Sequence, residues 1–339
     1  MKLNYKRTIL VGFAFFLISA FWQAYDNAIP LTLTNKFGMS QTWSGVIMAL
    51  DNILAVILLP VFGALSDKHN GKHGKRTPFI VIGTVLAAVA FVALSFVDNA
   101  QLKNLNDVAQ LDDPAALTRI YESQADKKLL TPEGDEFVLG DTFTLEQFTA
   151  IRSQTTDENG KAETNADYTN YVAPARQAYA WQVTTQSPAA LVIFVVLLLV
   201  VLLSMSLFRS PAVALMPDVT VKPLRSKANA VINLMGTAGG ILVLVLGIIF
   251  ATSAVRNSLM SYTVFFGIVA GIMLTALAVF LLTVREKRWA QQMQEDSIRY
   301  GIEEEVEQTG EKRQLTGSEK CSLLLILASI ALWYFGKFG

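Results

Sequence analysis

The sequence has few charged residues and almost no cysteine. Only 17% of its 339 residues are Asp, Glu, Lys or Arg, and there are two histidines and one cysteine, Cys321. A soluble domain is about a quarter charged, so this composition argues against an ordinary soluble enzyme. A single cysteine excludes an intrachain disulfide scaffold. No Asn-x-Ser/Thr sequon occurs.

The sequence contains several long apolar segments. Hydrophobic residues make up 52% of the chain, and the mean hydropathy is +0.40. A membrane helix needs about 20 mostly apolar residues. The pattern predicts an all-α polytopic membrane protein. The spans are expected near residues 8–27, 42–65, 77–97, 188–216, 228–252, 258–283 and 321–338.

Basic residues indicate the orientation of these spans. With the N-terminus in the cytoplasm, 18 Lys and Arg lie in the tail and the inner loops, and the short outer loops hold only Lys36 and Arg256. Cytoplasmic loops carry the excess of Lys and Arg. We therefore expect a multi-pass protein of the cell (inner or plasma) membrane with a cytoplasmic N-terminus.

The connection over residues 98–186 is long and acidic, with fifteen Asp and Glu against seven Lys and Arg. It follows three spans, so it is expected on the outer side. A mobile acidic loop is favoured because loops this long are usually functional or disordered, and a small folded cap is the alternative. The predicted divisions are 1–97 for helices one to three, 98–186 for this insert, 187–284 for helices four to six, 285–320 for a cytoplasmic central loop, and 321–339 for the start of a seventh helix. The short last span suggests that the chain is a fragment.

The most specific motif follows the second span. It reads GALSDK at residues 63–68 and GKRTPF at 74–79. A glycine lets two helices approach closely, and an aspartate at a helix end can pair with a basic residue. Such a pair can hold one conformation and release another; the alternative is a basic loop that only fixes topology. The motif residues are Gly63, Asp67, Lys68, Gly74, Lys75 and Arg76.

This motif resembles the loop between the second and third helices of the major facilitator superfamily, G-x-x-x-D-[RK]-x-G-[RK]-[RK], in the expanded form of its bacterial sucrose-transporter and glycoside–pentoside–hexuronide branches. The segment RSPAVALMPD at 209–218, leading to Arg225, is similar to the connection between helices four and five of those transporters. Plant members carry an arginine where this chain has Val213, whereas Arg209 here precedes the Ser-Pro pair. Asp51-Asn52 also looks like the bacterial members.

The resemblance implies a major facilitator fold, with an N-terminal six-helix bundle plus a seventh, truncated span. It implies a secondary transporter that binds substrate near the midplane and rocks between two states. The implied partners are a sugar or glycoside, H⁺ or Na⁺ as coupling ion, and the lipid bilayer.

Asp51 is the sharpest single candidate in the spans. It lies nine residues past Thr42, which is about 14 Å along a helix and near the middle of the bilayer. A carboxylate at that depth is costly and usually faces a cavity or a partner. We expect Asp51, beside Asn52, to carry the coupling proton; a structural Asp bonded to a neighbouring helix is the alternative.

A polar stripe on the first span suits a sugar. Ser19, Gln23 and Asp26 share one helix face by their spacing, with Trp22 beside them. Sugar hydroxyls need hydrogen-bond partners, and the apolar face of a sugar ring stacks on an aromatic ring. For Asp26 an interfacial position at the outer helix end is an equal alternative, and Trp22 is also typical of interfacial belts.

Further polar residues lie on the fourth and fifth spans. Asn229 and Asn233 are four residues apart and precede Gly236 and Gly240 on the same side, which indicates close helix packing. The asparagines are candidates for substrate or for another helix. Arg209 either extends to the headgroups or, if its helix continues, needs a partner inside the protein. Asp218 and Arg225 are assigned to the inner loop network.

Other chemistries find little support in the sequence. Asp67, His69 and His73 form a loose set in a basic loop, so no metal is expected, and no P-loop, nucleophile or dinucleotide motif occurs. We predict no enzyme activity, no cofactor and no nucleic-acid partner. A sodium-coupled glycoside symporter is the first alternative, and a non-transporting half-transporter is the second. A seven-helix receptor or an intramembrane enzyme fits the residues poorly.

Overall fold

The fold is seen in a computed structural model that describes residues 1–156, 160–302, 316–319, 321, 322, 325, 326 and 329. Met1–Asp296 form one compact unit, and Ser297–Gly339 form another. In the described part of the chain, six helical segments are long and apolar enough to cross a membrane. They are α1 (Tyr5–Leu31) with the π-helical η1 (Thr32–Lys36), α2 (Gln41–Lys68), α3 (Thr77–Asn104), α8 (Ala189–Asp218), α9 (Arg225–Ile249), preceded by η4 (Lys222–Leu224), and α10 (Thr263–Thr283).

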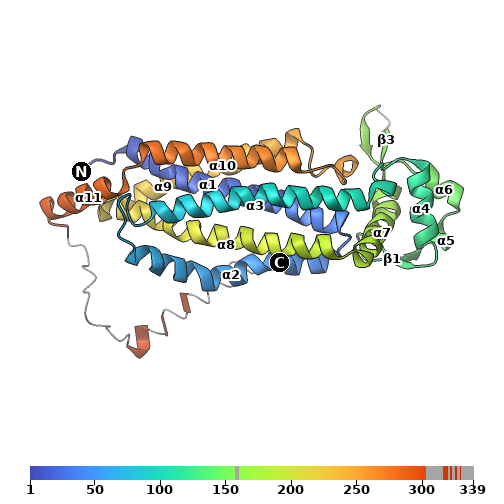
Figure 1. Cartoon of the computed structure of the whole chain (residues 1–339), viewed down its shortest axis with the longest axis horizontal. Coiled ribbons are helices and arrows are strands. Elements are labelled where there is room, and N and C mark those ends of the chain that lie inside the picture. The colour runs from blue at the N-terminus through green and yellow to red at the C-terminus, as the bar shows by residue number, and fades with distance from the viewer. Residues whose placement is uncertain (157–159, 303–315, 320, 323–324, 327–328, 330–339) are drawn as a thin grey trace. The chain divides into compact units, whose positions relative to one another are not determined.

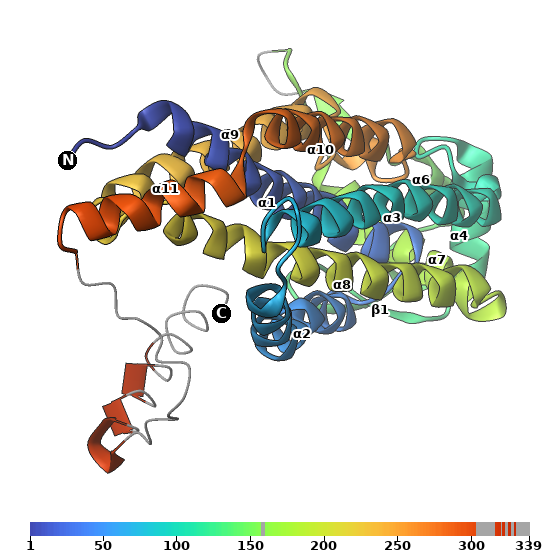
Figure 2. The same ribbon diagram turned by 60° about the vertical axis from the view of Figure 1, so that its left-hand side comes forward.

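These six helices form an all-α bundle, as predicted (Figure 1). α1 packs mainly against α9 and α10, α3 packs against α8 and α10, and α2 leans on α8 (Figure 2). Buried aromatic and aliphatic side chains fill the centre, with Phe21, Phe91, Phe208 and Phe266 among the fully buried ones. α2 is the least buried of the six. Most of the expected seventh span, 321–338, lies outside the described residues.

Polar side chains define where two of the helices begin. The Asn4 side chain accepts from the backbone N–H of Arg7 at the start of α1, and the Ser40 hydroxyl accepts from that of Trp43 at the start of α2. Such caps satisfy N–H groups that have no partner inside the helix. The helices therefore start at positions fixed by local sequence.

Residues 105–186 fold into a small element that we call the cap. It lies at one end of the bundle, and the N-terminus and α11 (Glu286–Arg299) lie at the other (Figure 1). Leu117, Ile120, Phe148 and Tyr168 belong to its own hydrophobic core. The prediction of a mobile acidic loop is thus wrong, and the alternative prediction of a small folded cap is correct. The segment folds because it has enough apolar side chains to form a core. Its elements are η2 (Asn106–Val108), α4 (Pro114–Gln124), α5 (Leu139–Thr142), α6 (Leu145–Ala150), η3 (Tyr168–Val172) and α7 (Ala173–Gln186) with two antiparallel hairpins, β1 (Lys128–Leu130) with β2 (Glu136–Val138) and β3 (Gln154–Thr156) with β4 (Ala162–Thr164).

The prediction that Lys36 lies in a short outer loop is also wrong. The first helix continues through η1, and the Lys36 side chain is fully buried. Its ammonium group pairs with Asp98 of α3, donates to the carbonyl oxygen of Met260 (2.6 Å) and lies 4.1 Å from the ring centroid of Tyr262. Asp98 in turn accepts from the backbone N–H of Tyr262 (3.0 Å). This ion pair fastens the cap ends of α1 and α3 to the start of α10.

Candidate functional site

Trp22 of α1 and Arg209 of α8 are in contact, and Asp51 of α2 lies within electrostatic range of Arg209. The Arg209 guanidinium lies 5.5 Å from the centroid of the Trp22 ring, which is a cation–π contact between α8 and α1. The charge of Arg209 also acts on the carboxylate of Asp51 on α2. Arg209 forms no ion pair or hydrogen bond with the described residues. Because α8 continues to Asp218, Arg209 lies about 14 Å inside the helix end, so its cation needs a partner within the bundle.

Unpartnered polar atoms surround this cluster. The indole N–H of Trp22 and the hydroxyl of Tyr25 are buried and have no hydrogen-bond partner among the residues that the structure describes. Buried polar groups are normally hydrogen-bonded, and an exception calls for an explanation such as a bound ligand. The Tyr25 and Trp22 rings meet edge to face with centroids 5.5 Å apart. The cluster therefore offers two hydrogen-bond donors beside aromatic surface.

The structure divides the predicted stripe of α1. Trp22 points to α8, whereas Ser19 and Gln23 lie against the glycines of α9. A Cβ atom at Gly236 would lie 3.0 Å from the Ser19 hydroxyl, and one at Gly240 would lie 3.8 Å from Oε1 of Gln23. Ser19 and Gln23 make no side-chain hydrogen bond with the described residues. Both side chains are half-buried where α1 and α9 pack closely.

Asn52 and the two asparagines of α9 lie apart from the contact between Trp22 and Arg209, whereas Asp26 lies within electrostatic range of Asp51. Asp26 is exposed, although its charge and that of Asp51 repel each other. Asn52 is exposed too. Asn229 and Asn233 are exposed in the first turns of α9, where Asn233 donates to the carbonyl oxygen of Asn229 (2.9 Å). The structure therefore gives them no shared contact with Trp22 or Arg209.

The motif after α2 forms an ion-pair network at the end of the bundle opposite the cap. Arg76 pairs with Asp67 of α2 and with Asp218 of α8 (2.7 Å), and it donates to the Ser66 hydroxyl. Burial lowers the pKa of Arg76, but the hydrogen bond to Asp218 and the charges of Asp218 and Asp67 outweigh it, so the pKa lies above its usual value. One guanidinium thus joins the ends of α2, α3 and α8.

Glu286 completes this network, although the sequence analysis does not identify it as a candidate residue. Its carboxylate accepts from the backbone N–H groups of Lys75 (2.6 Å), Arg76 (2.8 Å) and Thr77 (2.7 Å). Gly74 has φ +120°, and a Cβ there would lie 2.2 Å from the Glu286 carboxyl carbon. The glycine is needed for both its backbone angle and its lack of a side chain. The sequence signal for this role is that Glu286 is an acidic residue between basic residues directly after the sixth span.

The remaining motif residues have simpler surroundings. Lys68 and the Lys75 side chain are exposed. A Cβ atom at Gly63 would lie 2.8 Å from the Ser210 hydroxyl, so α2 and α8 approach closely there. Arg225 donates to the carbonyl oxygens of Pro217 (3.1 Å) and Thr220 (3.1 Å) after α8. It therefore holds the connection between α8 and α9.

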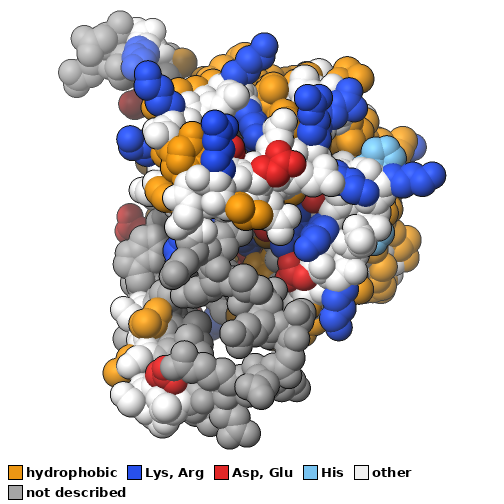
Figure 3. Space-filling view, turned by 90° about the vertical axis from the view of Figure 1, so that its left-hand side faces the viewer, with side chains coloured by type: hydrophobic (Ala, Val, Ile, Leu, Met, Phe, Trp, Pro, Cys, Tyr) orange, Lys and Arg blue, Asp and Glu red, His pale blue; other side chains and the backbone are white. Residues whose placement is uncertain are grey.

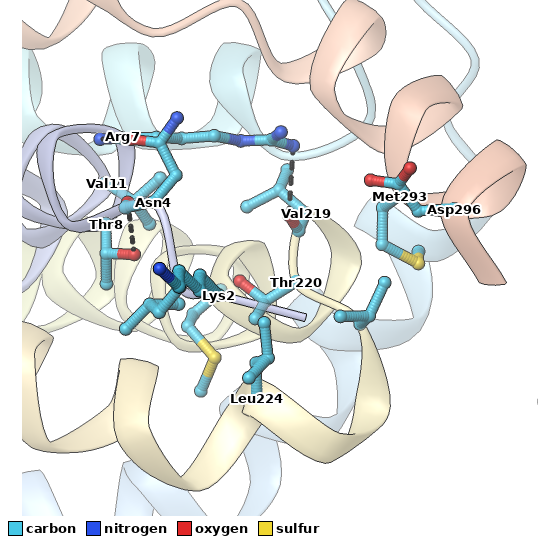
Figure 4. A pocket seen from close by; sticks show the side chains of 13 residues that line it. Lys2, Asn4, Arg7, Thr8, Val11, Val219, Thr220, Leu224, Met293 and Asp296 are labelled. Carbon is cyan, nitrogen blue, oxygen red and sulfur yellow. Dashed lines mark hydrogen bonds between the residues drawn. The ribbon is translucent and has the colours of Figure 1, made fainter. Parts of the chain in front are cut away.

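The same end of the bundle carries a basic surface and a small cavity. Lys and Arg side chains outnumber acidic ones on this face (Figure 3). The cavity, about 90 Å³, lies beside Arg7, which donates to the carbonyl oxygen of Val219 (2.9 Å) (Figure 4). Arg7 also donates to the carbonyl oxygen of Trp289 (2.6 Å). No predicted substrate residue lines it. Among the described residues no group of three or more His, Cys, Asp or Glu could hold a metal ion.

Comparison with known proteins matches residues 9–337 to the family described as the MFS_1 like family. The chain belongs to this family. The match covers nearly the whole sequence, so the predicted resemblance to major facilitator transporters is confirmed, and the protein is a multi-pass membrane protein of a transporter family. This family assignment points to a transporter and not to an enzyme.

One relative of this MFS_1 like chain is the sucrose transport protein SUC3 of Arabidopsis thaliana. The two are 30% identical over 73 residues, which is 20% of this chain and 12% of the relative. The match therefore spans about an eighth of that protein. No solved structure matches the chain.

Proposed function

We propose that the protein is a secondary active transporter that carries a sugar or glycoside, of the sucrose type, together with a proton by alternating access. The observation that supports this most is the cluster of Trp22, Asp51 and Arg209 in the bundle interior, with buried donors that have no partner. The likeness of a short segment to a sucrose transport protein supports the substrate class.

In this proposal the sugar lies between α1, α2, α8 and α9. Its apolar face stacks on Trp22, and its hydroxyls bond to Ser19, Gln23, the Trp22 N–H and Arg209. A sugar hydroxyl both donates and accepts hydrogen bonds, so it can satisfy donors and acceptors at once. Exposed asparagines on α9 and α2 have a supporting role; they are Asn229, Asn233 and Asn52. The negative charge of Asp26 repels that of Asp51.

Asp51 is the proposed coupling residue. When its carboxylate is ionised it is attracted to Arg209, and when it is protonated this attraction is lost. The released guanidinium then has its hydrogen-bond donors free for the sugar. Protonation and sugar loading would thus favour the same state, which is the requirement for coupling.

The network around Arg76 is the proposed conformational lock. Asp67, Asp218 and Glu286 hold the ends of α2, α8 and α11 to the start of α3. Opening of the bundle at this end requires some of these contacts to break. The basic face at this end (Figure 3) supports a cytoplasmic placement and a cytoplasmic N-terminus in the cell membrane.

The test is uptake by the whole chain reconstituted in liposomes. Radiolabelled sucrose would be offered under an inward proton gradient, an inward sodium gradient or no gradient. The expected result is accumulation driven by protons, at least tenfold weaker in Asp51→Asn, with sucrose exchange retained. Asp135→Asn, at an exposed acid of the cap, is the matched control.

Each other outcome changes the proposal in a defined way. Equal accumulation by Asp51→Asn and the unsubstituted chain would remove the coupling role of Asp51. Accumulation under the sodium gradient alone would replace the proton by sodium. Sucrose binding without uptake under any gradient would favour the half-transporter alternative, and neither binding nor uptake would reject a sucrose-type substrate.

A further inference from the structure

A second cavity lies where the cap meets the bundle. Its volume is about 200 Å³, and it is lined by residues of η1, η3, α7 and the segment after α9. An engineered cavity of about 150 Å³ accommodates benzene, so there is room here for a small organic molecule. None of the residues proposed to bind sugar lines this cavity. Its polar lining includes Asn35, Tyr168, Arg176, Gln177, Ser253 and Ser258.

Arg176 brings a buried positive charge to this cavity. Only 4% of the residue is exposed. Its two terminal nitrogens donate to the carbonyl oxygens of Val108 and Leu111 (3.0 Å for the latter). Its Nε–H makes no hydrogen bond of standard geometry within the described part of the chain. Among the described residues Arg176 forms no ion pair with a carboxylate. A buried charge is costly unless an opposite charge accompanies it, so this site favours an anion.

Tyr168 adds a second free donor. The residue is 1% exposed, and its hydroxyl makes no hydrogen bond of standard geometry with the described residues, although buried Tyr hydroxyls usually find a partner. Burial raises the pKa of the Tyr168 phenol against the opposing charge of Arg176 and a side-chain hydrogen-bond interaction with it. The phenol therefore stays protonated, and its O–H is able to donate. The nearby Asp112 carboxylate is already occupied, because it accepts from the backbone N–H (2.6 Å) and the hydroxyl (2.8 Å) of Ser153.

The backbone provides an independent observation. Both π-helical segments of the described chain, η1 and η3, contribute to this cavity, through Asn35 and Tyr168. π-helical turns are rare and occur often at functional sites. The hydroxyls of Ser253 and Ser258 and the amide of Asn35 line the same space and make no hydrogen bond with the described residues. They can bond to hydroxyl groups.

We propose that this cavity binds a small polyhydroxylated carboxylate, with Arg176 and Tyr168 as its recognition pair. The Nε–H and the phenol O–H donate to the two carboxylate oxygens, and Asn35, Ser253 and Ser258 bond to the hydroxyls. One positive charge and two donors match a monoanion with two acceptor oxygens better than they match a phosphate dianion. The site is separate from the proposed sugar site and adds an anion-binding function to the cap.

The test is equilibrium binding of radiolabelled gluconate to the detergent-solubilised whole chain, in a buffer free of carboxylate and phosphate. Sorbitol is the matched competitor, since it has the same carbon chain and hydroxyls without the carboxylate. We expect saturable binding that unlabelled gluconate displaces and sorbitol does not. Tyr168→Phe should weaken it roughly tenfold or more, which is the effect of losing one hydrogen bond to a charged group.

The matched control is Tyr262→Phe. Tyr262 is also fully buried with an unpartnered hydroxyl, but it does not line the cavity. Both variants remove only an unpartnered hydroxyl, so both are expected to keep the unfolding temperature. The proposal is overturned by absence of saturable gluconate binding, by equal displacement with sorbitol, by stronger displacement with phosphate, or by unchanged affinity in Tyr168→Phe.

Discussion

The carboxylate of Glu286 accepts from both the backbone N–H (2.7 Å) and the hydroxyl (2.6 Å) of Thr77, 209 residues earlier in the chain. Thr77 starts α3, and Glu286 starts α11. An anion at a helix N-terminus satisfies N–H groups that have no partner within the helix and complements the helix dipole. Side-chain caps normally come from the preceding few residues, whereas this one joins the ends of two distant segments.

Replacement of Glu286 by Ala should therefore destabilise the bundle. Three backbone N–H groups lose a charged acceptor, and the expected decrease in the free energy of unfolding is about 1–3 kcal/mol. Detergent-solubilised protein can be unfolded by heat or by sodium dodecyl sulfate to measure it. Glu295→Ala, at an exposed acid of the same helix, should have little effect; equal losses in the two variants would contradict the capping role.

Gly74→Ala tests the same contact from the opposite side. The substitution meets a left-handed backbone angle, φ +120°, and a Cβ position 2.2 Å from the Glu286 carboxyl carbon. Gly134→Ala is the matched control, because its φ is +97° and nothing lies within 4 Å of the added atom. Both variants carry the cost of the backbone angle, about 1 kcal/mol or more. The unfolding temperature should fall further for Gly74→Ala than for Gly134→Ala. The difference between the two decreases measures the steric clash with the Glu286 carboxylate.

The sequence predicts the bundle well because membrane helices are specified locally. Runs of apolar residues and their flanking charges are sufficient to place α1, α2, α8, α9 and α10 within about five residues of their observed ends. α3 begins where predicted but continues past residue 97 to Asn104. The cap is harder to predict. Its short helices and three-residue strands have no strong periodicity, and its core depends on residues as distant as Leu117 and Tyr168.

The candidate site is only partly predictable for the same reason. Helical spacing correctly separates the faces of a single helix, but it does not say which neighbour each face meets. Trp22 meets Arg209 of α8, whereas Ser19 meets Gly236 of α9. Lys36 is read as a loop base because the predicted first span ends at residue 27, and a π-helical segment carries it into the core. Tertiary packing decides both cases.

The buried pair of Lys36 and Asp98 should respond sharply to the loss of one member. Lys36→Met or Asp98→Leu alone leaves an uncompensated buried charge, and the expected loss of stability is about 3–5 kcal/mol. The double variant replaces the pair by apolar side chains and should recover much of that loss. Unfolding of the three variants in detergent completes a double-mutant cycle. If the stability losses of the two single variants add up to nearly that of the double variant, direct pairing of Lys36 with Asp98 would be contradicted.

An exposed ion pair of the cap provides the control for that cycle. Lys128 of β1 and Glu136 of β2 form a diagonal ion pair at 3.2 Å, with most of both side chains in solvent. Exposed pairs contribute only about 0–1 kcal/mol. Lys128→Ala should therefore leave the unfolding temperature nearly unchanged, and a loss as large as that of Lys36→Met would show that burial is not what makes the latter pair important.

A pair of glycine substitutions tests the close contact that places α1 beside α9. A Cβ atom at Gly239 would lie 2.5 Å from the carbonyl oxygen of Phe16, whereas one at Gly271 of α10 would have nothing within 4 Å. Alanine stabilises a helix interior relative to glycine by about 0.5–1 kcal/mol, and this gain is all that Gly271→Ala should show. At Gly239 the backbone of α1 must move, which costs about 1–3 kcal/mol. The two variants should thus change the unfolding temperature in opposite directions. Because Ser19 and Gln23 lie one and two turns further along the same interface, Gly239→Ala should also weaken sucrose binding if α1 and α9 together form the sugar site.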